Sequence, residues 1–288
     1  MFDNREHLQQ LGVFYPAMEF GQRPENRKHA AVFQALSKGG KEAQACLTRL
    51  CNAFAESGAD TMVISEEALG AMAGYNPGSL KPLAALKDTF ELEAICFVRR
   101  PDTFLESMWN QRCREGSTSK HIGAFCKKPN WKQYIQYDKF LSKWSKTARL
   151  HVLGYETIEK SDLFGAFARA IDIPQLPVSP VKNVSPSMTC AAVLAALQRT
   201  TSDRYNWRQI EEDLGPNTRK TALGGRLRRK ILADFSKQKG ILRRKYGVTF
   251  PTDLPDEPQD MLSRPDETEL AYFRAERFIL QPAEPKAS

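Results

Sequence analysis

The stretch LEAICFVRRPDTFLESMWNQRCREG, residues 92–116, carries the clearest structural pattern in the chain. Its first seven residues are mostly apolar and predict a buried strand over residues 92–98. Pro101 fits the first turn of a helix, where its missing N–H costs no hydrogen bond. Four apolar residues then recur at helical spacing, namely Phe104, Leu105, Met108 and Trp109. We therefore expect a strand that runs through Arg99 and Arg100 into an amphipathic helix.

Similar strand-like and helical stretches alternate along the rest of the chain. The expected strands span residues 12–15, 61–65, 92–98 and 150–153. The other expected helices span residues 41–56, 131–144, 162–171, 188–197 and 223–246. This alternation predicts an α/β fold, a parallel β-sheet flanked by helices with a helical C-terminal region. In such sheets, ligands bind beyond the carboxyl ends of the strands.

The length of 288 residues suits one large domain or two small ones. We expect an α/β domain over residues 1–250, with its helical part starting near residue 186. Residues 251–288 are rich in Pro, Asp and Glu, which predicts a loosely held tail. A short aromatic stretch over residues 272–278 is expected to dock back on the domain.

The composition indicates which kinds of binding partner and which cellular compartment to expect. Lys and Arg number 42 against 34 Asp and Glu, giving a formal charge of +8. That excess favours anionic partners such as nucleotides, acidic glycans, nucleic acid or a membrane surface, or it simply maintains solubility. The six cysteines form no CxxC pair and no zinc-like cluster, which fits a reducing compartment. With neither a signal-peptide pattern nor a long apolar run, we expect a cytoplasmic protein without a transmembrane segment.

Four polar side chains form a candidate anion site. Arg99 stands at the end of the expected strand, while Ser107, Gln111 and Arg114 share one helical face at i, i+4 and i+7. Arginine makes bidentate, charge-assisted bonds to phosphate, and serine adds a neutral donor. The pattern therefore predicts a phosphate-binding site. The alternative for Arg99 is a surface ion pair with an acidic residue of the same helix, Asp102 or Glu106.

Arg99, Pro101 and Ser107 resemble the 3′-phosphate-binding motif of the sulfotransferases, R-x-P with a serine two helical turns further on. In that family the arginine and the serine hold the 3′-phosphate of 3′-phosphoadenosine 5′-phosphosulfate. The aromatic residue two positions after the serine is usually tyrosine and is Trp109 here.

Other stretches resemble the bacterial branch of the same superfamily, in order, over residues 4–247. NREHLQQLGVFYP, residues 4–16, looks like the end of its first helix and its second strand, and His29 resembles a histidine that follows. VISEEAL, residues 63–69, looks like a strand ending in Ser, a small residue and Glu, although Glu66 replaces the small residue. KNVSPS, residues 182–187, resembles an Asn-x-Ser loop, and residues 235–247 resemble the closing helix.

The resemblance implies a P-loop sulfotransferase-like fold and metal-free, in-line transfer of a sulfuryl group to a hydroxyl, with carbohydrate as the expected acceptor. Glu67 or His29 would be the general base, and Asn183 and Ser185 would contact the donor or the acceptor. The alternatives are a Glu67 that stabilises the first turn of a helix and a structural His29.

The chain departs from the family at its start. The family opens with a strand and a Gly/Thr/Ser-rich loop, usually with a lysine, that binds the 5′-phosphosulfate. This sequence begins after that point, and Gly39–Lys41 follows a helix and not a buried strand. Either the true start lies upstream, or the chain is a non-catalytic remnant that binds a nucleotide or a glycan. A third alternative, nucleic-acid binding by the basic helix over residues 223–246, is disfavoured because few aromatic residues interleave with its charges.

Overall fold

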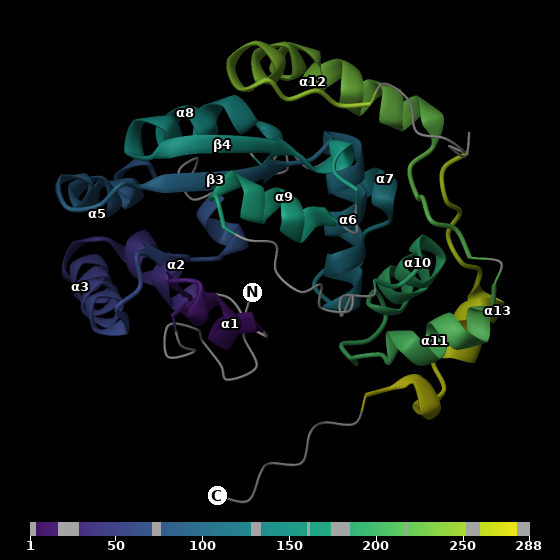
Figure 1. Cartoon of the computed structure of the whole chain (residues 1–288). Helices are drawn as coiled ribbons and strands as arrows, with labels where there is room; N and C mark the ends of the chain where they lie inside the picture. The colour runs from purple at the N-terminus through teal and green to yellow at the C-terminus, as the bar shows by residue number, and fades with distance from the viewer. Residues whose placement is uncertain are drawn as a thin grey trace, which may run out of the picture. The chain divides into compact units, whose positions relative to one another are not determined.

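The computed structural model describes residues 4–16, 29–70, 76–127, 134–159, 162–173, 185–216, 218–251 and 260–280. The protein is a mixed α/β structure in which helices dominate and the strands form small parallel sheets (Figure 1). The predicted α/β class is therefore confirmed at this coarse level. No helix in the described ranges is long and apolar enough to cross a bilayer.

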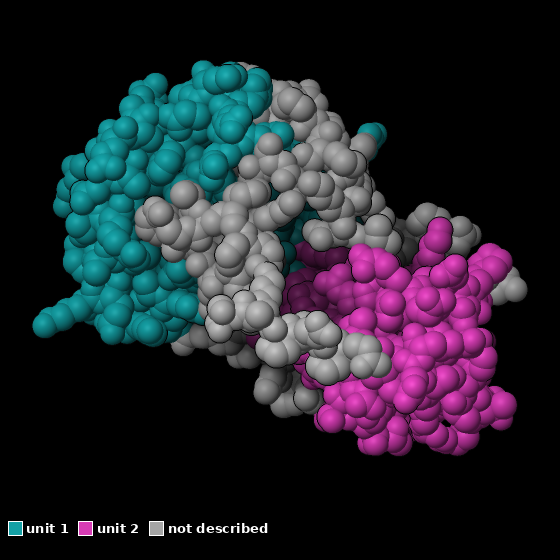
Figure 2. Space-filling view, turned by 90° about the horizontal axis from the view of Figure 1, so that it is seen from below, with its two compact units in different colours: residues 1–98, 136–180, 238–250 teal, residues 99–135, 181–237, 251–288 magenta. Residues whose placement is uncertain are grey.

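The chain divides into two compact units, coloured separately in Figure 2. Unit 1 comprises residues 1–98, 136–180 and 238–250, and unit 2 comprises residues 99–135, 181–237 and 251–288. All four named strands belong to unit 1, while the described part of unit 2 is built from helices. The division places Arg99 and the helix after it in unit 2.

Unit 1 contains two pairs of parallel strands. β1 (Val13–Phe14) pairs with β2 (Thr61–Met62), and β3 (Glu93–Val98) pairs with β4 (Arg149–Gly154). Both the positions of the strands and their parallel direction follow the prediction. In the described residues they form two separate two-stranded sheets, whereas the sequence predicted a single sheet.

The helices of unit 1 follow the same periodic patterns. α3 (Gly40–Ser57) buries Ala43, Cys46, Leu47 and Leu50 on one face, and it ends at Gly58, whose left-handed backbone (φ 65°) favours glycine. α8 (Tyr137–Thr147) packs on β4 and begins six residues later than the predicted residue 131. The remaining elements are α1 (Arg5–Gln10), α2 (Ala30–Lys38), η3 (Pro77–Leu80), α5 (Lys81–Ala84), η4 (Ala85–Asp88), η6 (Tyr155–Thr157) and α9 (Leu163–Ala170).

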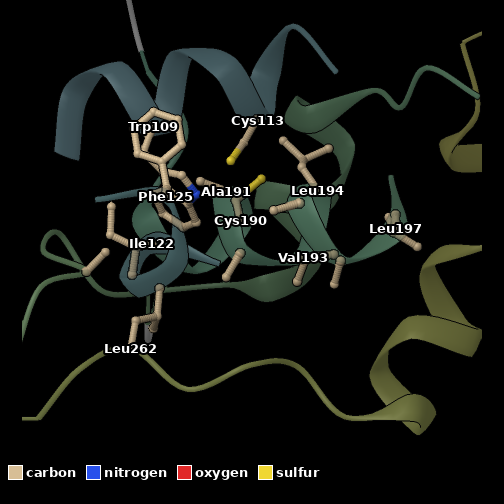
Figure 3. Packing of buried hydrophobic residues seen from close by; sticks show 14 of the residues in the cluster. Trp109, Cys113, Ile122, Phe125, Cys190, Ala191, Val193, Leu194, Leu197 and Leu262 are labelled. Carbon is tan, nitrogen blue, oxygen red and sulfur yellow. The ribbon is translucent and has the colours of Figure 1, made fainter. Parts of the chain in front are cut away.

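Unit 2 is organised around α6 (Pro101–Arg114) and α10 (Met188–Leu197). α10 is buried from Cys190 through Leu197, and an apolar helix of this kind forms the centre of a core. Trp109 and Cys113 of α6 pack against it, together with Ile122 and Phe125 of α7 (Ile122–Phe125) (Figure 3).

The C-terminal segment contributes to the core of unit 2. The elements here are α11 (Trp207–Leu214), the first part of α12 (Gly225–Tyr246), α13 (Glu267–Phe273) and η8 (Glu276–Phe278), whereas α12 belongs to unit 1 from Gln238 onward. Leu270, Phe273 and Phe278 are buried in the same cluster as α10. The docking of the aromatic stretch predicted from the sequence is thus confirmed, within unit 2.

Candidate anion-binding site

The side chain of Arg99, just before α6, is oriented along that helix. Its Nε donates to Thr103 Oγ1 at 3.2 Å, and the Thr103 hydroxyl donates to the carbonyl of Arg100 at 2.9 Å. Thr103 lies four residues before Ser107 and therefore on the same side of the helix. We call the set Arg99, Thr103, Ser107, Gln111 and Arg114 the α6 polar face.

The α6 polar face is accessible at its centre. Ser107 and Gln111 are exposed, and Arg99 and Arg114 are half-buried. Gln111 Nε2 donates to Glu115 Oε1 at 2.8 Å, so this amide already has a partner within the helix. Ser107 is thus the exposed hydroxyl one helical turn beyond the Arg99–Thr103 contact.

The neighbouring Arg100 points into the interior of unit 2, where it is 2% exposed. It makes two bonds of 2.7 Å to the Asp102 carboxylate and donates to the carbonyl of Pro251 at 3.1 Å. Asp102 also accepts from Arg228 on α12. Burial alone would raise the pKa of Asp102, but the hydrogen bonds and charges of Arg100 and Arg228 outweigh it and hold that pKa below its usual value.

Glu106 completes this buried ionic network. Arg228 Nη2 contacts both of its carboxylate oxygens, at 3.1 and 3.2 Å. The same carboxylate accepts from the backbone N–H groups of Ala222 and Leu223, at 2.7 and 2.8 Å. Two buried arginines therefore balance two buried carboxylates, and the network ties α6 to α12. Asp102 and Glu106, which the sequence offered only as alternative surface partners of Arg99, are instead buried partners of Arg228, whose burial was not predicted.

The segment containing Ser185 lies beside α6. Asn110, 3% exposed, donates through Nδ2 to the carbonyl of Pro186 at 2.7 Å. Ser185, the residue before this proline, is exposed. The structure thus brings Ser185 to the helix that carries Ser107, and Asn110 is a contact that the sequence did not reveal. Asn183 lies outside the described residues.

The two candidate bases lie in unit 1, at the carboxyl ends of β1 and β2. The N–H of Ser65 donates to His29 Nδ1 at 2.9 Å, and the N–H of His29 donates to the carbonyl of Ser65 at 3.0 Å. His29 is 3% exposed, with its ring edge-on to Tyr15 at a centroid distance of 4.6 Å. Two stretches that carry the family resemblance therefore meet here.

The environment of His29 favours its neutral form. Burial lowers the pKa of His29, although hydrogen bonds to the backbone of Ser65 and Pro16 and the charge of Glu66 oppose this shift. Because Nδ1 accepts from the N–H of Ser65, the proton of the neutral ring is assigned to Nε2. His29 thus holds the end of β2 against the start of α2.

Glu67 and Glu66 lie at the start of the helical residues 67–70. Glu67 is exposed, as a base that meets an acceptor must be. Glu66 Oε1 accepts from the N–H of Ala68 at 3.0 Å, which caps this turn, and Glu66 Oε2 is buried without a hydrogen-bond partner among the described residues. The base role of Glu67 or of His29 stays a prediction.

Acidification is expected to destabilise the protein through two histidines, the buried His29 and the half-buried His121. Burial lowers the pKa of both His29 and His121 in the folded state, so the unfolded chain binds more protons. Their contribution to stability is present above about pH 6.5, the unfolded value, and is lost as the pH falls below it. Urea unfolding at pH values between about 7.5 and 5.5 should show this loss in the wild type. The double variant His29→Gln/His121→Gln should show a flatter pH dependence, and an unchanged slope would contradict the assignment.

The basic helix has one buried and several exposed cations. Arg228 is buried, whereas the side chains of Arg226, Arg229, Lys230 and Lys237 are exposed on the other side of α12. In the described ranges, no cluster of His, Cys, Asp and Glu has the arrangement of a metal site, and all six cysteines are free thiols.

Comparison of the chain with protein-family models, with curated proteins and with solved structures gives no match.

Proposed function

We propose that the α6 polar face binds the 3′-phosphate of 3′-phosphoadenosine 5′-phosphosulfate, and that the chain is a sulfotransferase-like protein with a fold of that superfamily. The observation that carries the proposal is the hydrogen bond from Arg99 Nε to Thr103 Oγ1, which holds the guanidinium group at the first turn of α6, one turn before Ser107. Two residues that a sequence motif links to phosphate thereby share one helical surface.

The spacing along α6 suits a single tetrahedral anion. Thr103 and Ser107 are four residues apart, a rise of about 6 Å along the helix axis. Thr103 holds Arg99 and gives its own proton to the Arg100 carbonyl, so the donors that would face the anion are the Arg99 guanidinium group and the Ser107 hydroxyl one turn further on. Charge-assisted bonds from arginine and a bond from serine would then hold different oxygens of the same group.

The proposed reaction is sulfuryl transfer to a hydroxyl, with carbohydrate as the proposed acceptor. The hydroxyl oxygen attacks sulfur, the bond from sulfur to the 5′-phosphate oxygen breaks, and adenosine 3′,5′-bisphosphate leaves. The hydroxyl proton passes to a base, for which we propose Glu67. Its exposure favours it over His29, whose Nδ1 lone pair accepts the N–H of Ser65.

Removing the Ser107 hydroxyl should weaken binding of adenosine 3′,5′-bisphosphate about 10- to 100-fold, because a bond to a charged group is worth about 1.5–3 kcal/mol. Arg99→Gln should weaken it about 10- to 100-fold by the same reasoning. Isothermal titration calorimetry of the wild type, Ser107→Ala and Arg99→Gln measures these changes. Ser236→Ala, which alters an exposed serine on α12, is the matched control and should bind like the wild type.

Adenosine 5′-monophosphate, which lacks the 3′-phosphate, isolates the contribution of the site. The wild type should bind it more weakly than the bisphosphate, and Ser107→Ala should leave this weaker binding unchanged. Equal affinity of the wild type for the two nucleotides would overturn the proposal.

A further inference from the structure

We propose that Thr103 is a positioning residue of this site, which orients the Arg99 guanidinium group and so sets the preference for nucleotides that carry a 3′-phosphate. This inference rests on the proposed function and deepens it, because Thr103 lies outside the R-x-P and serine motif and here receives a role in the preference for the 3′-phosphate.

The direction of the hydrogen bonds at Thr103 supports the inference. A hydroxyl has one proton to donate, and Thr103 gives it to the carbonyl of Arg100 at 2.9 Å. A lone pair of Oγ1 therefore faces Arg99 Nε, which donates to it at 3.2 Å. The hydroxyl acts on Arg99 as an acceptor only. An alkyl side chain of the same shape cannot make either bond.

The carbonyl of Arg100, to which this hydroxyl donates, is itself held in place. The carbonyl of Arg100 also accepts the N–H of Phe104 at 2.9 Å, and the Arg100 side chain is held by Asp102. Thr103 is β-branched, so its χ1 angle in a helix has few alternatives, one of which bonds the carbonyl three residues earlier. Oγ1 thus presents an acceptor to Arg99 from a rigid first turn of α6.

The contact engages Nε, the donor nearest to the aliphatic part of the arginine side chain. Holding Nε fixes the rotation of the planar guanidinium group and with it the directions of the two Nη groups. An arginine that is oriented before the ligand arrives loses less rotamer freedom on binding. Removing the hydroxyl would keep the charge of Arg99 at the site but remove its orientation.

Two variants at this position test the inference. Thr103→Val keeps the shape and removes the hydroxyl, whereas Thr103→Ser keeps the hydroxyl. We measure by calorimetry the affinities of each variant for adenosine 3′,5′-bisphosphate and for adenosine 5′-monophosphate. Thr103→Val should lower the ratio of the two affinities about 3- to 10-fold, the effect of losing one hydrogen bond. Thr103→Ser should keep the ratio within about 2-fold of the wild type.

The ratio separates orientation from general damage, because a distorted α6 would weaken the binding of both nucleotides. A double-mutant cycle adds a second measurement: in an Arg99→Gln background, Thr103→Val should have no further effect on the ratio. A loss that persists in this background would overturn the inference, as would a Thr103→Val ratio equal to that of the wild type while Arg99→Gln abolishes the preference. A wild type without preference between the nucleotides would instead overturn the proposed function itself.

Discussion

Replacing Arg228 by methionine should lower the free energy of unfolding by about 3–5 kcal/mol, the typical cost of removing one partner from a buried ion pair. Arg228 is 1% exposed and contacts both Asp102 and Glu106. Methionine fills much of the same volume but leaves these two carboxylates with only one buried arginine, Arg100. Equilibrium unfolding in urea, followed by circular dichroism, measures the loss.

The adjacent Arg229 provides a matched control for this prediction. It lies on the same helix and is exposed, so Arg229→Met removes the same charge without disturbing the ionic network. Surface substitutions of this kind usually change stability by no more than about 0.5 kcal/mol. If the two variants lost the same stability, net charge and not the buried network would be responsible.

The sequence predicted which arginines follow β3 but not which of them enters the interior. Arg99 and Arg100 are adjacent and chemically identical, and only Arg99 fits the family motif. Arg100 is buried because Asp102 and the carbonyl of Pro251 receive it, and Pro251 is 151 residues away in the chain. Contacts over such separations follow from tertiary packing, which local periodicity does not encode.

The burial of Arg228 had a signal in the sequence that was not used. Ile231 and Phe235 follow it at i+3 and i+7, and both are buried. An apolar stripe at this spacing marks the inner face of a helix, and Arg228 lies on it. A cation on an apolar stripe requires buried carboxylate partners, and Asp102 and Glu106 on α6 supply them.

The strands and long helices were predictable because each depends on a short run of residues. The apolar run over residues 92–98 gives β3, and the buried helix over residues 188–197 is predicted with both ends correct.

The division into two units was not visible in the sequence, because the chain passes between them several times and neither unit is continuous in sequence. For the candidate site, the sequence predicted the placement of residues only where they share one helix, α6. The hydrogen bonds between His29 and Ser65 and between Asn110 and Pro186 join segments that are far apart in the sequence, so the local pattern did not predict them.

Trp109 occupies the position where the resembled family usually has tyrosine. Its surroundings indicate that it serves in the packing of the core. The side chain is fully buried against α7 and α10 (Figure 3), and its Nε1 donates to the carbonyl of Lys120 at 2.8 Å. It is thus part of the hydrophobic core of unit 2, which packs against the buried side of α6 and so supports the α6 polar face.

Trp109→Ala should therefore lower the free energy of unfolding by about 3–5 kcal/mol, since a cavity forms between α6, α7 and α10 that these helices can only partly close. Trp109→Phe keeps most of the apolar contact and loses the bond to Lys120, so it should cost about 1–3 kcal/mol. Urea unfolding of both variants and the wild type measures this order. Equal losses in the two variants would show that the hydrogen bond of Trp109, which both variants remove, matters more than its packing. Equal stability of all three proteins would show that α6 does not depend on this contact, and the support of the α6 polar face would then have to come from the buried network of Arg228 alone.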